Sequence, residues 1–317
     1  MSGPARSAVL WGGGLGDTLV VRPLLQALAR DGSEPPVFMT RVGHIPALPM
    51  AFGLPVSELR LTGSPLQALS QVRRAGRFDL VYLGPHATSK TRLLARGMKA
   101  GRIWTSTEEA DNSFIGDVVR HDVVRLGLAQ EAPLPYGGVP VFRAADAPIS
   151  ESGAVVLHIG AKSQWETKKW PTERWQVLVR RMLTHSGREL VFVGAADEAI
   201  EIQSLLRDIP ESQGRVRIAA GLDFAALEGV IAGAHCVICH NSGIMHLAAA
   251  WQKPTVVLTG ASARYWRPPY PWVRNVTSGL CELACNRYRC PVPGYNAKCI
   301  KELGVTQVWV AVAPLLN

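Results

Sequence analysis

The chain of 317 residues contains no apolar run long enough to cross a lipid bilayer. Its amino terminus passes from residues 1–6 directly into an apolar segment, without the charged, apolar and cleavage regions of a secretory signal peptide. These absences predict a cytoplasmic protein. Any contact with the inner face of the inner membrane would then be peripheral and would use basic surface groups.

Long Lys/Arg blocks and aromatic-basic motifs for nucleic acid are also missing, so no nucleic-acid partner is expected. The 34 Lys and Arg residues nevertheless outnumber the 25 Asp and Glu residues, giving a formal charge of +9. This excess favours anionic partners such as phosphorylated glycans, although a solvated basic surface explains it equally well. The hydrophobic fraction of 47% is sufficient for two cores.

The hydrophobic pattern predicts two successive α/β halves. In the first half we expect strands over 8–11, 36–39, 80–83 and 102–105, and helices over 18–30, 65–74, 89–98 and 113–126. In the second half we expect strands over 154–158, 189–193, 236–239 and 255–258, and helices from near Pro171 and over 197–207. Residues 130–153, rich in Pro, Gly, Ala and Ser, are the predicted linker. This pattern indicates two Rossmann-like domains, 1–148 and 149–317, facing a cleft.

The segment 239–260 reads as a strand, a polar turn, a small-residue helix and a second strand. Open α/β sheets bind ligands at such turns. Ser242 is a good helix N-cap, and amides beside Gly243 would suit a phosphate or diphosphate. His246 would face the turn from one helical turn further on. The alternative is a capped helix with a structurally satisfied histidine.

A glycine-rich loop, residues 12–17, follows the first predicted strand but does not complete the dinucleotide-binding pattern G-x-G-x-x-G. The third glycine of that pattern would fall on Asp17 or Leu19. Asp17 is therefore either the N-cap of helix 18–30 or a general base aimed into the cleft.

Two further segments suggest contacts with a nucleotide. Lysines 162, 168 and 169 precede a predicted helix, as in a diphosphate clamp, although ordinary surface lysines would look the same. Glu198 follows a strand that ends near Gly194, a position from which Rossmann-like domains reach a ribose hydroxyl. It is equally well placed as an acidic residue in the first turn of a helix.

Taken together, these motifs resemble the ADP-heptose:lipopolysaccharide heptosyltransferases of glycosyltransferase family 9. In chain order they are Gly16-Asp17, His158-x-Gly160-Ala161, Lys168-x-Trp170-Pro171, Gly194-x3-Glu198 and Ser242-Gly243-x2-His246, with Pro254 and Gly260 beyond. The tail, with Cys281, Cys285, Cys290-Pro291 and Cys299-Ile300, is similar to the heptosyltransferase II branch. The resemblance implies the GT-B fold, with two facing Rossmann-like domains and mainly parallel sheets. Domain 1–148 would bind the acceptor and domain 149–317 the nucleotide sugar, with the C-terminal segment packing back on the first domain.

The same resemblance implies an inverting, metal-independent transfer of heptose from ADP-heptose to a hydroxyl of the lipopolysaccharide inner core. Asp17 would deprotonate the acceptor hydroxyl and Lys168 would neutralise the departing diphosphate. The donor-binding residues would be Gly160, Lys168, Glu198, Asn241, Ser242, Gly243 and His246. An anionic glycan or glycolipid acceptor would meet Arg92, Arg120 and His121, unless these only form a solvated basic face.

One position departs from the family pattern, because Asn241 stands where members usually carry Asp. An amide replaces a carboxylate that could bind sugar hydroxyls, so two alternatives stay open. One is an enzyme of this fold that uses another nucleotide sugar, or a protein or other acceptor. The other is a catalytically idle protein that binds nucleotide sugars.

The six cysteines fall into two groups. Cys236 and Cys239 lie on an apolar strand and are expected to be core residues. Clustered thiols in a cytoplasmic protein suggest a structural zinc or iron site, here Cys281, Cys285, Cys290 and Cys299. Their spacing lacks the usual C-x2-C pairs, so oxidised pairs or plain structural thiols are alternatives.

Overall fold

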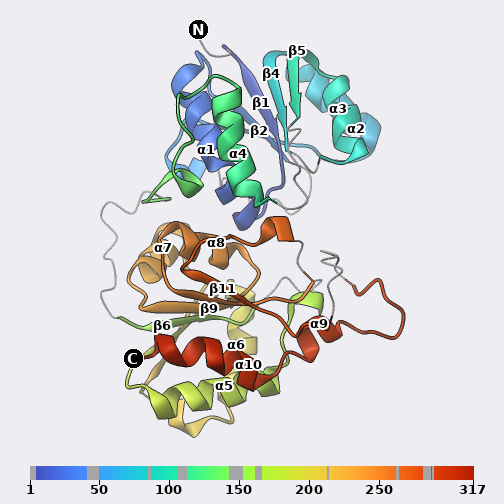
Figure 1. Ribbon diagram of the computed structural model, residues 1–317. Helices are drawn as coiled ribbons and strands as arrows, with labels where there is room; N and C mark the ends of the chain where they lie inside the picture. Colours follow the sequence, from blue (N-terminus) through green and yellow to red (C-terminus); the bar gives the residue numbers. More distant parts are fainter. Residues whose placement is uncertain are drawn as a thin grey trace. The chain divides into compact units, whose positions relative to one another are not determined.

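The computed structural model describes residues 5–40, 50–84, 87–105, 113–142, 153–160, 166–212, 214–261, 264–280, 287 and 289–317. The chain divides into two compact units, Met1–Arg143 and Ala144–Asn317, each built around one parallel sheet (Figure 1). The predicted boundary at 148/149 falls outside the described residues and stays a prediction.

The sheet of the first unit has the strand order β3-β2-β1-β4-β5. Its strands are β1 (Ser7–Leu10), β2 (Val37–Thr40), β3 (Ser57–Arg60), β4 (Arg77–Leu83) and β5 (Lys99–Thr105). Helices α1 (Leu15–Asp31) and α4 (Ile115–Arg125) cover one face, and α2 (Pro65–Arg74) and α3 (Ser89–Arg96) the other (Figure 1). Single 3-10 turns lie at Met50–Phe52 and Pro135–Gly137. Every residue of β1 is buried, as expected for a central strand between two helical layers.

The predicted linker is wrong for residues 130–142, which form a strap packed on α1. The buried guanidinium of Arg22 donates to the carbonyl oxygens of Tyr136 and Gly138, both at 2.7 Å, and of Pro140 at 2.9 Å. The side chains of Tyr136 and Phe142 are also buried. This Pro- and Gly-rich segment is therefore held on α1 because the buried guanidinium of Arg22 donates hydrogen bonds to three of its carbonyl groups.

The sheet of the second unit has the order β11-β10-β9-β6-β7-β8. Its strands are β6 (Val155–His158), β7 (Leu190–Gly194), β8 (Val216–Ala220), β9 (Cys236–His240), β10 (Thr255–Leu258) and β11 (Val273–Val276). The helices are α5 (Thr172–His185), α6 (Ala199–Leu206), α7 (Phe224–Ala232), α8 (Gly243–Ala250), α9 (Lys298–Lys301) and α10 (Val305–Val312). Short 3-10 turns η3 (Glu166–Lys168), η4 (Ala196–Glu198), η5 (Pro210–Ser212), η6 (Arg264–Trp266) and η7 (Ala313–Leu315) join them.

Helices α5, α6 and α10 cover one face of this sheet, and α7 and α8 the other (Figure 1). The C-terminal helix α10 contributes to the core of the second unit, and the expected packing of the C-terminal segment on the first domain stays a prediction. Val308 and Val312 of α10 are fully buried and join the same core cluster as Trp175 and Leu178 of α5. The apolar face of α10 is thus used to cover the second sheet.

Candidate functional site

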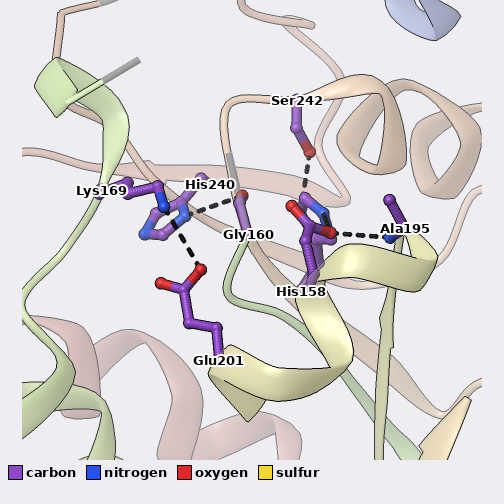
Figure 2. Close-up of polar contacts among 8 residues, drawn as sticks. His158, Gly160, Lys169, Ala195, Glu201, His240 and Ser242 are labelled. Atoms are coloured by element: carbon purple, nitrogen blue, oxygen red, sulfur yellow. Dashed lines mark hydrogen bonds and ion pairs between the residues drawn. The ribbon is translucent and has the colours of Figure 1, made fainter. Parts of the chain in front are cut away.

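The candidate site lies at the carboxyl edge of the second sheet, where the strand order reverses. Strands β6 and β9 are neighbours there, although the strands β7 and β8 lie between them in sequence. Ligands of open α/β sheets bind at this kind of switch point. His158 ends β6 and His240 ends β9, while Glu198 and Ser242 follow β7 and β9 in the next turns. Figure 2 shows the polar contacts that join this edge.

Glu198 is held by a backbone amide and by a histidine. Its Oε2 accepts a hydrogen bond from the amide of Ala195 at 2.8 Å and lies 3.6 Å from Nε2 of His158. Burial by itself would raise the pKa of Glu198. The hydrogen bond and charge of His158, then the Ala195 amide and the Lys169 charge, outweigh it and hold that pKa below its ordinary value. Glu198 is therefore an ionised carboxylate at neutral pH. Its bond to the Ala195 amide also caps the 3-10 turn η4, which is the purely structural role expected of an acidic residue in a first helical turn.

Two glycines make room for this carboxylate. A β-carbon on Gly194 would lie 2.5 Å from Oε2 of Glu198, and one on Gly160 would overlap the same carboxylate group. Neither glycine has a positive φ, so conformational freedom is not the reason for glycine here. The predicted donor-binding residues Gly160 and Glu198 are thus brought into contact.

Ser242 occupies the N-cap position of α8, as predicted, but its side chain does not cap the helix. Its hydroxyl is instead 3.3 Å from Nδ1 of His158 (Figure 2). The amides of the first turn of α8, beginning at Gly243, therefore point to the sheet edge without a bond from the Ser242 hydroxyl. Such a helix start suits an anion.

His240, which sequence reasoning did not select, connects three segments at this edge. Its Nε2 accepts a hydrogen bond from the amide of Trp170 at 3.1 Å. Its Nδ1 then carries the proton and donates to the carbonyl of Gly160 at 3.3 Å (Figure 2). Burial, and after it the charge of His158, lowers the pKa of His240 to about 3. The imidazole is therefore neutral, and it fixes the strand end against the start of α5.

Lys168 ends the 3-10 turn η3, which packs beside the end of β10. The carbonyl of Thr167 accepts from the amide of Ala261 at 3.2 Å. Burial, and after it the positive charge of Lys168, lowers the pKa of the buried His246 to about 3. Lys168 and His246 are therefore electrostatic neighbours, and the predicted lysine does approach helix α8.

Asn241 is buried, and its amide nitrogen donates to Sδ of Met245 at 3.5 Å. This side chain turns back onto α8. Beside the site, the ammonium group of Lys169 pairs with the carboxylate of Glu201 at 3.3 Å.

Asp17 lies at the corresponding switch point of the first sheet, after β1. It is not the N-cap: α1 begins at Leu15, Gly14 is the cap, and the Asp17 carboxylate accepts from the Gly14 amide at 3.2 Å. A β-carbon on Gly12 would lie 2.5 Å from Oδ1 of Asp17. The glycine loop therefore accommodates the carboxylate at the carboxyl edge of its sheet.

The three predicted acceptor-binding residues are not brought together. Arg92 lies on α3, whereas Arg120 and His121 lie on α4, on the opposite face of the first sheet (Figure 1). Arg120 pairs with Asp117 at 2.7 Å and donates to the carbonyl of Pro133, so it has a structural role in holding the strap. Arg92 and His121 are exposed.

Cys236 and Cys239 are fully buried on β9, which confirms them as core residues. Burial raises the pKa of the Cys236 thiol to about 12 and also raises that of Cys239. Of the four tail cysteines, Cys290 is partly buried and Cys299 is buried, and Cys281 and Cys285 lie outside the described residues. Within the described ranges no three or more His, Cys, Asp or Glu side chains are grouped to hold a metal ion.

Two parallel α/β units, each with a polar cluster at a switch point, define the GT-B class of fold, as the sequence predicted. The sequence profile of glycosyltransferase family 9 (heptosyltransferase) matches residues 133–296, just over half of the chain. The chain belongs to this family.

Curated relatives match over shorter stretches. Lipopolysaccharide heptosyltransferase 2 of Escherichia coli (strain K12) is 30% identical over 105 residues, which are 32% of this chain and 30% of the relative. Lipopolysaccharide heptosyltransferase 1 of Pseudomonas aeruginosa is 29% identical over 136 residues, or 42% of this chain and 36% of the relative. The matched stretches thus span about a third of the length of these relatives.

Solved structures share the fold over nearly the whole chain. A family 9 glycosyltransferase from Veillonella parvula has a TM-score of 0.68 at 17% identity, covering 98% of this chain and 97% of that one. The E. coli heptosyltransferase WaaC with ADP has a TM-score of 0.64 at 16% identity, covering 98% and 99%. In the part of the chain that the structure describes, no helix is long and apolar enough to cross a membrane.

Proposed function

We propose that the protein is an inverting heptosyltransferase that transfers heptose from ADP-heptose to a hydroxyl of the lipopolysaccharide inner core. The observation that carries this proposal is the meeting of the donor motifs at one sheet edge. Glu198 and Ser242 are linked there through His158, Gly160 lies against the Glu198 carboxylate, and Lys168 approaches the same edge beside His246. Family membership and the curated heptosyltransferase relatives point to the same donor class.

Each group has a role that follows from its charge. The amides at the start of α8 and the ammonium of Lys168 would bind the diphosphate, and their interaction strengthens as the leaving group gains charge. The Glu198 carboxylate, ionised at neutral pH, would accept hydrogen bonds from the ribose hydroxyls. The buried, neutral His246 and Asn241 would shape the pocket beside them.

Asp17 would act in the acceptor half of the reaction. Its carboxylate would take the proton from the acceptor hydroxyl as the oxygen attacks the anomeric carbon and the nucleoside diphosphate departs. One displacement of this kind inverts the configuration at that carbon. All the charge that develops is met by protein groups, so we propose a reaction without a catalytic metal.

A second candidate follows from Asn241 and from the fold. Asn241 offers no carboxylate to a sugar hydroxyl, and its amide nitrogen donates to Sδ of Met245. UDP-GlcNAc 2-epimerase from Methanocaldococcus jannaschii shares the fold with a TM-score of 0.58 at 11% identity. The alternative is therefore an enzyme that acts on a different nucleotide sugar. A nucleotide-sugar-binding protein without activity is the remaining outcome.

Calorimetric binding of ADP-heptose, ADP, UDP and UDP-glucose separates these candidates. We expect preference for the ADP ligands and a loss of roughly 10- to 100-fold in affinity in Lys168→Ala, because one charge-assisted contact contributes about 1.5–3 kcal/mol. Lys253→Ala is the matched control, since Lys253 is a part-buried lysine at the amino end of β10. Preference for UDP ligands, or equal losses in both variants, would refute the proposal.

Acceptor transfer is tested with Asp17→Asn, which keeps the size of the side chain. We expect the transfer rate to fall by at least about 100-fold while ADP-heptose affinity is unchanged, because a general base contributes about 10²–10⁴-fold. Unchanged transfer would exclude Asp17 as the base.

We also propose peripheral contact with an anionic membrane through helices α2 and α3. Leu66 and Leu93 on these helices are 78% and 67% exposed, and Lys90, Arg92 and Arg96 on α3 are exposed beside them. Exposed apolar side chains next to basic ones are typical of a membrane-surface face. Co-sedimentation with vesicles containing anionic lipid should fall in Leu93→Ser.

A further inference from the structure

The ring of His158 contacts two of the residues that we propose for donor binding, Glu198 and Ser242. Its two ring nitrogens face different partners: Nε2 lies 3.6 Å from the Glu198 carboxylate, and Nδ1 lies 3.3 Å from the Ser242 hydroxyl. The ring itself is buried. Glu198 comes from the turn after β7 and Ser242 from the start of α8, so the histidine joins the two ends of the donor site (Figure 2).

The carboxylate dictates which nitrogen carries the proton when His158 is neutral. An ionised Glu198 is an acceptor only, so Nε2 must hold the hydrogen that points to it. Nδ1 is then an acceptor, and the Ser242 hydroxyl must donate to it. In this state the hydroxyl hydrogen is turned away from the start of α8.

Protonation of His158 reverses the direction of the hydrogen bond between Nδ1 and the Ser242 hydroxyl. Both nitrogens of an imidazolium are donors, so Nδ1–H now donates to the Ser242 oxygen. The hydroxyl hydrogen is released and can be donated to an anion held at the amides of α8. A proton from solvent on Nδ1 therefore supplies both a positive charge and a new hydrogen-bond donor for the ligand.

We propose that His158 is a positioning residue that couples uptake of one proton to binding of the donor diphosphate, with Ser242 as the group that changes partner. This inference rests on the proposed function only in so far as the ligand carries a diphosphate. It adds a residue and a pH dependence that the motifs alone do not assign.

The titratable groups around His158 come from the neighbouring elements. His240, at the end of β9, has its pKa lowered to about 3 by burial first and stays neutral. Glu198 stays ionised because its pKa lies below the ordinary value. Lys169, after η3, is paired with Glu201 of α6 at 3.3 Å. We therefore assign the proton that is taken up with the ligand to the imidazole of His158, whose two partners can both accept from an imidazolium.

The test is calorimetric binding of ADP-glucose and UDP-glucose at about pH 6 and about pH 8, in buffers of different ionisation enthalpy. These ligands suit the test because their diphosphates are diesters and take up no proton in this range. We expect net proton uptake and tighter binding at the lower pH, by up to tenfold per pH unit, the limit for one linked proton.

The variants separate the charge from the change of partner. His158→Gln can still donate to Glu198 and accept from Ser242, so it should bind at both pH values as the wild type does at high pH, without proton uptake. Ser242→Ala should weaken binding roughly tenfold at about pH 6 and little at about pH 8, because the hydroxyl faces the ligand only when His158 is charged. His185→Gln, at an exposed histidine on α5, should behave as the wild type.

The outcomes distinguish a failure of the role proposed for His158 from a failure of the proposed ADP donor. Proton uptake with UDP-glucose alone would refute the ADP donor but support His158, because the contact is with the diphosphate. Binding without proton uptake, or an equal loss in Ser242→Ala at both pH values, would overturn the role of His158 and leave the donor class intact. Absence of binding by any nucleotide sugar would overturn both.

Discussion

Mild acid should destabilise the second unit because two histidines are buried in the neutral form. His240 and His246 are 0% and 3% exposed, and burial lowers both pKa values to about 3. In the unfolded chain each would titrate near 6.5. The unfolded state therefore binds more protons between these values. Stability from these groups is complete above about pH 6.5 and is lost as the pH falls towards 3.

The magnitude follows from these two pKa values. Between pH 7 and about pH 5 each histidine should remove about 2 kcal/mol from the free energy of unfolding, or about 4 kcal/mol for the pair. A domain is stable by only about 5–15 kcal/mol, so the effect is a large part of the total. Burial is the main cause for His240, and its contacts also disfavour the charged ring, because a protonated Nε2 would face the N–H of Trp170 at 3.1 Å.

Urea unfolding followed by tryptophan fluorescence measures this effect. Trp175 packs at 5.5 Å, edge to face, against His240 and reports on the second unit. In His240→Gln, the amide oxygen can still accept from Trp170, so the stability lost between pH 7 and pH 5 should shrink by about 2 kcal/mol. His185→Gln should leave the loss unchanged. The reasoning is refuted if wild type and His240→Gln lose the same stability over this interval.

Two further predictions concern the strap and the cysteines. Arg22→Met should destabilise the first unit by about 3 kcal/mol or more in thermal or urea unfolding, because three carbonyl groups lose a charged donor; an Arg30→Met control on the same helix should change stability little, and equal losses would contradict the role of Arg22. If the tail cysteines bind zinc or iron, elemental analysis should find about one metal ion per chain, and Cys290→Ser should lower this metal content. A metal-free protein with unchanged stability would favour plain structural thiols.

The central strands could be predicted from the sequence, and so could the edge strand β5 in part, whereas the other three edge strands could not. β6 and β9 are short runs of buried apolar residues, and their predicted bounds differ from the structure by one residue. The strands β3, β8 and β11 lie at the edges of the two sheets. Each of them carries a charged residue, namely Glu58, Arg217 and Arg274. Their strand character comes from pairing with a neighbour, which a local pattern of hydrophobicity does not record.

The motifs expected to bind the donor were recognisable in the sequence because they combine glycines, a lysine and helix-start residues in a fixed order. The bonds that hold them together were not, since they join residues far apart. His240 reaches the Trp170 amide 70 positions away and the Gly160 carbonyl 80 positions away. Such partners become predictable only once the strand order is known. The strap residues around Tyr136 were misjudged for the same reason, because their carbonyls bind Arg22 from 114 or more positions away.

The two histidines that end β6 and β9 occupy equivalent positions on neighbouring strands but differ in their partners. The partners of His240 are an amide and a carbonyl of the main chain, which cannot rearrange when a proton arrives. The partners of His158 are a carboxylate and a hydroxyl, which can both accept from an imidazolium. His240 must therefore exclude a proton to keep the fold, whereas His158 can take one without losing a contact. The contacts of His158 are therefore compatible with a protonated ring, whereas those of His240 are not.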